Sequence, residues 1–340
     1  MPKERRQHFL PEFHLGLFAT GRRREVWVFD KLHGKYGRRP VASSAFSRDY
    51  YALPGATEDE RLALEREFAR LENLVAPLIR RLDSVPPGPT ALDEGERINL
   101  AGYAALLHVR VPAYRDDALK RAQELSVDPE ALGLADPVRF LGGARRRGIH
   151  GSDEDLERRR LQMLEGLQTG AFRVTFTNAI SLGGIAPALS RGAPLMLARE
   201  WELLRVGAFP GLVIGDQPVT LFSHGQLAPS IGFGSPDVQV MVPLSDRTLL
   251  LVSDRPRPPM PLFTKVEVRP GLREPWWSIA NKVAWLTAQR YVWGRSRAAL
   301  EATESTIRPD LRQRDLRVLD EEQEARRREI ARERLRVTPP

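Results

Sequence analysis

The chain has 340 residues, 42% of them hydrophobic and 28% charged, so it can bury a large core and has the composition of an ordinary globular protein. It contains no cysteine, which excludes disulfides, thiol nucleophiles and cysteine-ligated metal sites. No apolar run approaches the roughly 18 residues needed to span a bilayer. Because Pro11, Glu12 and His14 interrupt the apolar segment near the start, we expect no leader, no membrane association and a cytoplasmic location.

The net charge is +8, and residues 1–40 carry ten basic against four acidic side chains. Six of the 52 basic residues are lysines, which leaves 46 arginines. Arginine binds phosphate in a bidentate manner, so one interpretation is a polyanionic partner such as nucleic acid. The alternative is a bias in base composition, with the arginines spread over solvated faces. We favour this alternative, since aromatic residues are not interleaved with the arginines.

The first half of the chain reads as one strand followed by helices. Residues 25–30 are β-branched and aromatic between two glycines, which predicts a strand. A capping box at Thr57 and Glu60 starts a helix whose apolar residues recur at three- and four-residue steps to position 82. Pro77 lies inside that helix and leaves the carbonyl of Asn73 without its helical donor. A second helix starts at Thr90 or Asp93 and ends near position 110, and residues 113–170 and 186–205 are also predicted to be helical.

In the second half the apolar pattern changes to that of strands. Short β-rich segments separated by Gly, Pro and Asp turns lie at 212–214, 219–222, 238–242, 248–252 and 265–268. A helix is predicted from 275 to 294. The fold class is therefore α+β, with a helical middle and an antiparallel-leaning sheet formed mainly by residues 210–270 together with the N-terminal strand. We expect one domain over residues 1–297 and a charged, helical extension over 298–340.

Several short motifs occur in an order and at spacings that resemble one bacterial family, the domain-of-unknown-function family 4238, over roughly residues 5–297. The motifs are Gln7-His8 with Pro11 and Phe13, Trp27-Val28-Phe29-Asp30, Asp49-Tyr50-Tyr51, Leu71-Glu72, Ala76-Pro77-Leu78, Arg110-Val111-Pro112 with Arg115, Trp201, Gly215-Asp216-Gln217-Pro218-Val219, Pro243-Leu244-Ser245, Asn281 and Arg290-Tyr291-Val292. The resemblance implies that these residues cluster in one fold unit. It implies no reaction, since the family has no established activity. The family usually has Ser-Asp-Asn-Pro where this chain has Gly215-Asp216-Gln217-Pro218, so a role for that serine is lost.

His8 is the first candidate for chemistry, because a neutral imidazole can act as a general base or bind a metal near pH 7. Gln7 would orient it or contact a substrate amide. The alternative for His8 is an imidazole whose two nitrogens are satisfied by backbone groups. With no cysteine, the ligands available for a divalent metal are His8 and carboxylates, which suit manganese, magnesium or zinc without selecting one.

Two carboxylates complete the catalytic candidates. Asp216 follows an apolar strand, where a rigid scaffold can present a catalytic group, although an Asx turn explains it equally well. Glu72 would be partly desolvated beside the free carbonyl and could act as an acid with a raised pKa, but a salt bridge to an arginine such as Arg110 is the favoured alternative. Arg110 and Asn281 are the candidate substrate-binding donors.

Two functional hypotheses follow. The sequence contains no P-loop, dinucleotide-binding, zincin or α/β-hydrolase motif, so neither hypothesis has the support of such a motif. The first is a hydrolase in which His8, Asp216, Glu72, Arg110 and Asn281 line one cavity that binds a phosphate- or amide-containing small molecule or nucleic acid, as a phosphodiesterase or nuclease would. The second is a non-catalytic nucleic-acid or protein interaction module that uses the basic N-terminal surface. The sequence specifies neither the substrate nor the oligomeric state.

Overall fold

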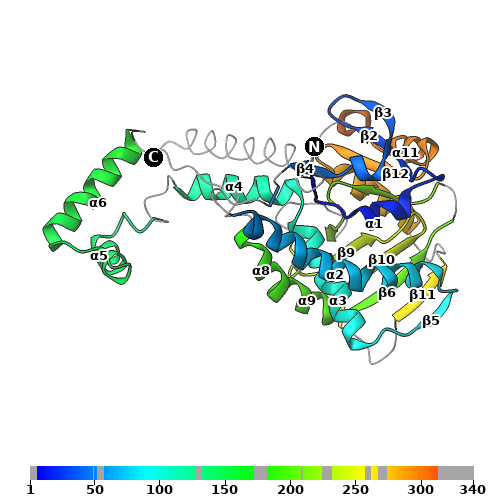
Figure 1. The fold of residues 1–340 in the computed structure, drawn as a ribbon, viewed down its shortest axis with the longest axis horizontal. Coiled ribbons are helices and arrows are strands. Elements are labelled where there is room, and N and C mark those ends of the chain that lie inside the picture. The colour runs from blue at the N-terminus through cyan, green and yellow to red at the C-terminus, as the bar shows by residue number, and fades with distance from the viewer. Residues whose placement is uncertain are drawn as a thin grey trace, which may run out of the picture.

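A computed structural model describes residues 6–48, 50–51, 57–126, 132–169, 171, 182–207, 210–223, 232–256, 262–266 and 274–312. It shows three sheets with helices packed on them, which confirms the α+β fold class (Figure 1). No helix in these ranges is both long and apolar enough to cross a membrane. Glu60 of the predicted capping box lies outside the described side chains.

A six-stranded sheet forms the centre of the molecule, and its strand order is β5-β11-β6-β10-β9-β8. All neighbours are antiparallel except β11 and β6, which run parallel. The strands are β5 (Gly88–Thr90), β6 (Arg199–Arg205), β8 (Thr220–Ser223), β9 (Val238–Pro243), β10 (Thr248–Pro256) and β11 (Leu262–Val266). The sheet thus contains most of the strands predicted over 210–270.

The prediction of a helix over 186–205 is wrong in its second half, because β6 occupies residues 199–205. Before it lie the short helices α8 (Ile185–Pro187) and α9 (Ala193–Leu197), joined by the π-helical turn Ala188–Gly192. Trp201 and Leu203 of β6 are buried while Glu202 between them is half-buried, a two-residue alternation that suits a strand. The Trp201 indole N–H donates to the Met196 carbonyl over 2.8 Å and fixes the corner between α9 and β6.

A second sheet brings the two ends of the described chain together in the order β3-β2-β12-β7. Its strands are β2 (Glu25–Asp30), β3 (Lys35–Pro40), β7 (Val213–Gly215) and β12 (Tyr291–Gly294), all antiparallel. The expected N-terminal strand therefore joins the same body as residues 210–300. The predicted helix 275–294 is wrong beyond residue 287, because α10 (Trp276–Thr287) ends there and residues 291–294 form a strand.

Helices α10 and α11 (Arg297–Glu304) pack on this second sheet around a small core. That core contains Phe29, Val213, Trp285 and Val292. Because α10 contacts both β7 and β8, it also connects the two larger sheets. The last described segment is the 3₁₀ turn Pro309–Leu311.

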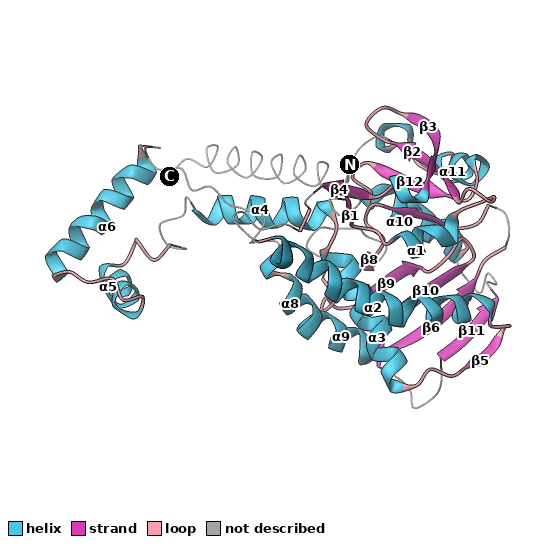
Figure 2. Cartoon of the chain, in the orientation of Figure 1, coloured by secondary structure: helices cyan, strands magenta, loops and turns pink. Residues whose placement is uncertain are grey.

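The long helices cover the six-stranded sheet (Figure 2). They are α2 (Glu58–Ser84) and α3 (Glu94–Val109), and their apolar faces share one core with β6, β8, β9 and β10. Asp93 caps α3 in a reciprocal capping box with Glu96, which places the helix start at the second of the two predicted positions. Beyond α3 come α4 (Pro112–Ser126), α5 (Pro137–Arg146) and α6 (Asp153–Gln168), in the segment predicted to be helical, and α5 and α6 contact each other.

The N-terminal segment forms a two-stranded ribbon of β1 (Arg6–His8) and β4 (Phe46–Arg48), in which His8 pairs with Phe46. The short helix α1 (Glu12–Leu15) and the 3₁₀ turn Gly16–Phe18 follow β1, and a second 3₁₀ turn, Val41–Ser43, precedes β4. This arrangement brings β1 and α1 against α2.

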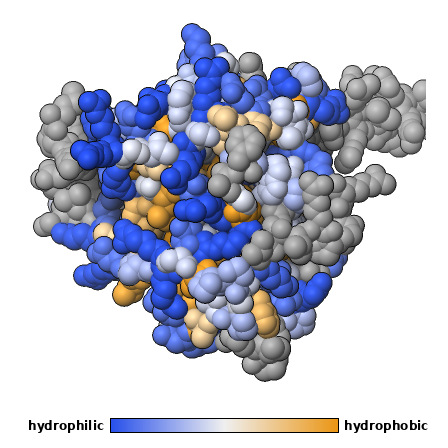
Figure 3. Space-filling view, turned by 90° about the vertical axis from the view of Figure 1, so that its right-hand side faces the viewer, coloured by the Kyte–Doolittle hydropathy of each residue, from blue (hydrophilic) through white to orange (hydrophobic). Residues whose placement is uncertain are grey.

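The face of the molecule that lies on the right in Figure 1 is covered mainly by hydrophilic residues, with hydrophobic residues in small separate patches (Figure 3). Among the described residues on this face, the exposed apolar surface is therefore discontinuous.

Candidate functional site

A cavity of about 370 Å³ lies where β1 and α1 meet α2. Most of its wall belongs to one face of α2, and β1, α1 and the residue after α3 complete it. The lining residues are His8, Pro11, Glu12, Phe13, Glu65, Ala69, Glu72, Asn73, Ala76, Pro77, Arg80 and Arg110. Three of the predicted site residues, His8, Glu72 and Arg110, are thus brought together.

The face of α2 that lines the cavity has a readable sequence pattern. Glu65 and Glu72 are seven residues apart, which places them on the same side of a helix, and the small residues Ala69 and Ala76 lie between and after them. The adjoining stripe of α2, which includes Phe68, is buried in the main core. Sequence reasoning missed Glu65, although the seven-residue spacing of the two acids beside alanines was the signal that could have identified it.

His8 is held by its backbone and has one unsatisfied side-chain nitrogen. Its carbonyl accepts hydrogen bonds from the Tyr51 hydroxyl, at 3.3 Å, and from Arg110 Nη2. Its Nε2 is buried and has no hydrogen-bond partner among the described residues, while Glu12 Oε1 lies 3.5 Å away. Since Nε2 is unpaired, we assign the bond to the Ala42 backbone to Nδ1, which makes Nε2 the basic nitrogen.

The environment of His8 favours the neutral imidazole. Burial lowers the pKa of His8 below 6.5; Glu12 raises it, and Arg110 lowers it again. An unprotonated imidazole at neutral pH can accept a proton, and Glu12 is placed to stabilise the imidazolium that then forms. His8 therefore has the properties of a general base.

Glu65 has the opposite character. Its Oε1 is buried and has no partner within the part of the chain that the structure describes. Burial raises the pKa of Glu65 above 4.5, Arg110 lowers it, and the neighbouring charge of Glu72 raises it. A carboxyl group that is kept protonated more readily than usual can donate a proton. His8 and Glu65 therefore form a candidate base and acid in one cavity.

Glu72 makes the salt bridge that was the favoured alternative in the sequence. Arg110 Nη1 lies 2.7 Å from Glu72 Oε1, and the Arg110 side chain is only 2% exposed. Arg110 Nε donates to the Tyr51 hydroxyl over 3.1 Å, and the guanidinium lies 5.0 Å from the ring centre of Phe68. The guanidinium is committed to groups of the protein itself.

The expectation that Asp216 shares a cavity with His8 is wrong for this cavity, which Asp216 does not line. Asp216 lies at the end of β7, and its carboxylate accepts backbone N–H groups of Gln289, Arg290 and Tyr291 over 2.8, 2.8 and 2.9 Å. It fixes the turn between α10 and β12 and so has a structural role, although its partners are distant in sequence and not the local backbone of an Asx turn. Burial raises its pKa, and these three donors lower it.

Two predicted substrate contacts are also absent from the cavity wall. Asn281 accepts from the Val213 N–H and donates to the Gly211 carbonyl, each over 2.9 Å, and so fastens α10 to the start of β7. Gln7 is buried, and its Oε1 accepts the Tyr51 N–H over 2.6 Å. Both side chains therefore bind backbone groups of distant segments instead of lining the cavity.

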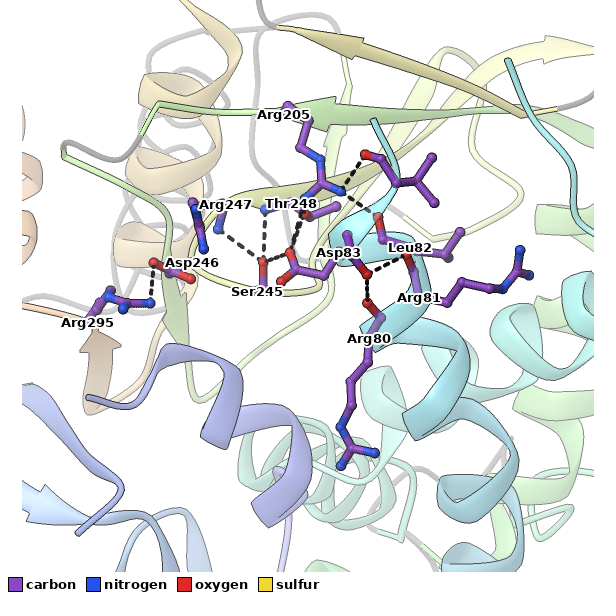
Figure 4. Close-up of polar contacts among 12 residues, drawn as sticks. Arg80, Arg81, Leu82, Asp83, Arg205, Ser245, Asp246, Arg247, Thr248 and Arg295 are labelled. Carbon is purple, nitrogen blue, oxygen red and sulfur yellow. Dashed lines mark hydrogen bonds and ion pairs between the residues drawn. The ribbon is translucent and has the colours of Figure 1, made fainter. Parts of the chain in front are cut away.

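The C-terminal end of α2 is anchored to the central sheet by a polar cluster around Asp83 (Figure 4). Ser245, Thr248 and Arg205 all donate to Asp83 Oδ1. Arg205 Nη2 also donates to the Leu82 carbonyl over 2.7 Å. The side chain of Arg80, which lines the cavity, points away from this cluster. The cluster keeps the cavity-forming helix in a fixed position on the sheet.

The other side of the cavity is fixed by His14 on α1. His14 is fully buried; its Nε2 donates to the Pro243 carbonyl over 2.8 Å, and its Nδ1 lies 2.9 Å from the Tyr103 hydroxyl. Because a carbonyl can only accept, Nε2 carries the proton of the neutral ring. Nδ1 then accepts a hydrogen bond from the Tyr103 hydroxyl, so this arrangement suits a neutral imidazole. Burial lowers the pKa of His14 to about 4. His14 thus joins α1 to α3 and β9.

The basic N-terminal segment is partly neutralised within the fold. Arg38 pairs with Glu25, and Arg39 lies over the ring of Tyr291. Lys31 is buried and donates to two backbone carbonyls at the end of α10. The exposed cations of this segment include residues 22–24 and Lys35, at the two turns of the β2–β3 region.

Within the described ranges, no three His, Asp or Glu side chains are arranged to hold a metal ion. The divalent metal at His8 stays a prediction.

Comparison with known proteins gives one match. Neither the curated proteins nor the solved structures contain a significant match to the chain. The profile of the protein family of unknown function DUF4238 matches residues 6–298, which include the whole cavity and all the residues that anchor it. On this match the chain belongs to the DUF4238 family.

Proposed function

We propose that the protein is a hydrolase that cleaves an amide bond in the cavity between α1 and α2, with His8 as general base and Glu65 as general acid. One observation carries this proposal: His8 Nε2 and Glu65 Oε1 are both buried without a hydrogen-bond partner among the described residues, and both residues line the same cavity. Buried polar atoms are normally paired, so two unpaired atoms at one cavity point to a bound group.

The proposed reaction uses the two groups in sequence. His8 Nε2 removes a proton from water as its oxygen attacks the amide carbonyl, and Glu12 stabilises the imidazolium. The Glu65 carboxyl then donates its proton to the leaving nitrogen, and the carbon–nitrogen bond breaks to give a carboxylic acid and an amine. His8 returns its proton to Glu65 through solvent. Asn73, which lines the cavity, provides an uncharged donor for the carbonyl oxygen.

The charges around the cavity favour an amide over a phosphate. Among the described residues that line the cavity, the three acids Glu12, Glu65 and Glu72 outnumber the two arginines, Arg80 and Arg110. Arg110 is already bound to Glu72, Tyr51 and the His8 carbonyl, which leaves Arg80 as the cation available to a ligand. A phosphate would meet more negative than free positive charge, whereas a neutral amide avoids this repulsion.

The experiment compares a panel of chromogenic amides with a phosphodiester, using wild type, His8→Gln, Glu65→Gln and the control His33→Gln. His33 is a suitable control because its side chain is 55% exposed and it lies on the β2–β3 turn. We expect amide turnover that falls by about 10²- to 10⁴-fold in His8→Gln, as for loss of a general base, and that does not change in His33→Gln. Parallel assays with EDTA, manganese, magnesium and zinc test whether a metal takes part.

The pH dependence provides an independent check. The plot of turnover against pH should be bell-shaped. Its rising limb has a midpoint below pH 6.5, where His8 loses its proton, and its falling limb has a midpoint above pH 4.5, where Glu65 ionises. Glu65→Gln should remove the falling limb. Equal turnover by wild type and His8→Gln would refute the assignment of the base, and cleavage of the phosphodiester alone would refute the substrate class.

A further inference from the structure

Arg110 lies at the point where three walls of the cavity meet. It follows α3 directly, its Nη2 donates to the carbonyl of His8 on β1, and its Nη1 donates to Glu72 on α2 over 2.7 Å. These three elements are far apart in the sequence. One buried side chain therefore connects the segment that carries the proposed base to the helix that carries the proposed acid.

The guanidinium is held on all sides. Besides its bonds to His8 and Glu72, its Nε donates to the Tyr51 hydroxyl over 3.1 Å, and its carbon lies 5.0 Å from the ring centre of Phe68. The Tyr51 hydroxyl itself donates to the His8 carbonyl over 3.3 Å. If Arg110 turned toward a ligand, a carboxylate and a carbonyl would lose their donor, which is costly at a buried site.

We propose that Arg110 is the positioning residue of this site: together with Tyr51 it fixes the backbone of His8 relative to Glu72, and it does not bind substrate. This inference rests on the proposed function of His8, but it concerns a geometry that can be measured without a substrate. It also replaces the role of substrate contact that the sequence suggested for Arg110.

The same contacts give Arg110 an electrostatic effect on both proposed groups. Burial lowers the pKa of His8, and the charge of Arg110 lowers it further. Burial raises the pKa of Glu65, and the charge of Arg110 opposes that rise. Removing the charge should therefore raise the pKa of both groups, whereas a merely structural loss would have no reason to move them in this direction.

Two neighbouring tyrosines, Tyr51 and Tyr50, provide a test variant and its matched control. Tyr51 and Tyr50 are 2% and 4% exposed and their rings are in edge-to-face contact. The Tyr51 hydroxyl bonds to Arg110 and to His8, whereas the Tyr50 hydroxyl has no hydrogen-bond partner in the described part of the chain. Tyr51→Phe and Tyr50→Phe each remove one buried oxygen, but only the first disturbs the proposed support of His8.

The experiment follows the His8 ring signal of ¹³C-histidine-labelled full-length protein by NMR from pH 4 to 8, with His8→Gln to assign the signal. Wild type, Arg110→Gln, Arg110→Lys, Tyr51→Phe and Tyr50→Phe are compared, and thermal melting shows which variants are folded. Arg110→Gln should raise the His8 titration midpoint. Arg110→Lys keeps the charge, so its midpoint should remain near that of wild type.

Measurements of turnover distinguish the effect of Arg110 on the position of His8 from the effect of its charge. Arg110→Lys should lose about 10²-fold in kcat, the effect of a misplaced catalytic group, although its His8 titration is nearly normal. Tyr51→Phe removes the hydrogen bonds of its hydroxyl to the His8 carbonyl and to Arg110 and should lower kcat by at least about tenfold, whereas Tyr50→Phe should match wild type. The proposal would be overturned if Arg110→Gln folds and the titration midpoint of His8 is unchanged. It would also be overturned if Tyr51→Phe and Tyr50→Phe change the chemical shift of the His8 ring equally.

The outcomes distinguish this inference from the proposed function. If no amide is turned over, the His8 titrations of the arginine and tyrosine variants still support or refute the positioning role. If Arg110→Gln does not fold, the chemical shift of the neutral His8 ring in Arg110→Lys and Tyr51→Phe decides, independently of the titration midpoint. A changed chemical shift supports the proposal, and chemical shifts identical to those of wild type in both variants refute it.

Discussion

Protonation of His14 should destabilise the protein and loosen the α1 wall of the cavity. The imidazole is fully buried between Tyr103 of α3 and the Pro243 carbonyl of β9, and it lies next to the cavity residue Phe13. Burial lowers the pKa of His14 from 6.5 to about 4. A second proton on the ring would face the Tyr103 hydroxyl, which now donates to that nitrogen, so the bond would have to reverse.

The size of the effect follows from linkage. In the folded protein His14 binds its proton less readily than in the unfolded chain, so stability is fully present above pH 6.5 and is lost as the pH falls toward 4. One pKa unit is worth about 1.4 kcal/mol, so the full interval corresponds to about 3 kcal/mol of unfolding free energy. His108 has a pKa lowered to about 4 by burial as well, so the wild type should lose more in total.

The assay is urea denaturation of wild type and His14→Gln between pH 8 and pH 4, with His150→Gln, at an exposed histidine, as the control. At pH 8 the glutamine variant should be less stable by about 2–3 kcal/mol, because two buried hydrogen bonds are lost. As the pH falls to 4 the difference from wild type should disappear, since only wild type carries the proton penalty of His14. A difference that stays constant from pH 8 to pH 4 would refute the reasoning.

Three further outcomes test the remaining structural assignments. Gly215→Ser places a Cβ within 2.7 Å of the Ala284 carbonyl oxygen, so urea denaturation should show a loss of about 1–3 kcal/mol, and unchanged stability would contradict this close approach. Asn281→Ala leaves a buried N–H and a buried carbonyl without their partner and should cost about 2–4 kcal/mol, whereas amide turnover in the folded variant should persist. Charge reversal of the arginines at residues 22–24 should leave turnover unchanged; DNA binding that falls steeply with salt in wild type and is lost in this variant would instead favour the interaction-module hypothesis.

Much of the fold could be predicted because the apolar periodicity is clear. The strands at 25–30, 238–242 and 248–252 and the helix that begins near position 58 all occur close to their predicted bounds. The two wrong assignments, at 199–205 and 291–294, fall on short segments that follow helices and carry only two or three large apolar residues each. A short apolar segment does not distinguish a helix end from a strand, and sheet pairing with β10, β2 and β7 decides these cases.

The site could be predicted only in part. His8, Glu72 and Arg110 come together as expected, and the Glu72–Arg110 salt bridge was already the favoured interpretation. Asp216 could not be assigned from sequence, since its partners are backbone N–H groups more than seventy residues further along the chain. Spacing within a sequence does not show which distant backbone groups a polar side chain will meet, and this contact decides between a cap and a catalytic group.

The polar residues of the family motifs fall into two groups with different consequences. Gln7, Asp216 and Asn281 each bind backbone groups of another segment, so they connect β1, α10 and β7 to their neighbours. His8 differs from these because its side chain retains an unpaired buried nitrogen at a cavity, and Glu65 of the same cavity retains an unpaired oxygen. Substitution of a connecting residue should therefore change the free energy of unfolding first, whereas substitution of His8 or Glu65 should change turnover in a protein that still folds.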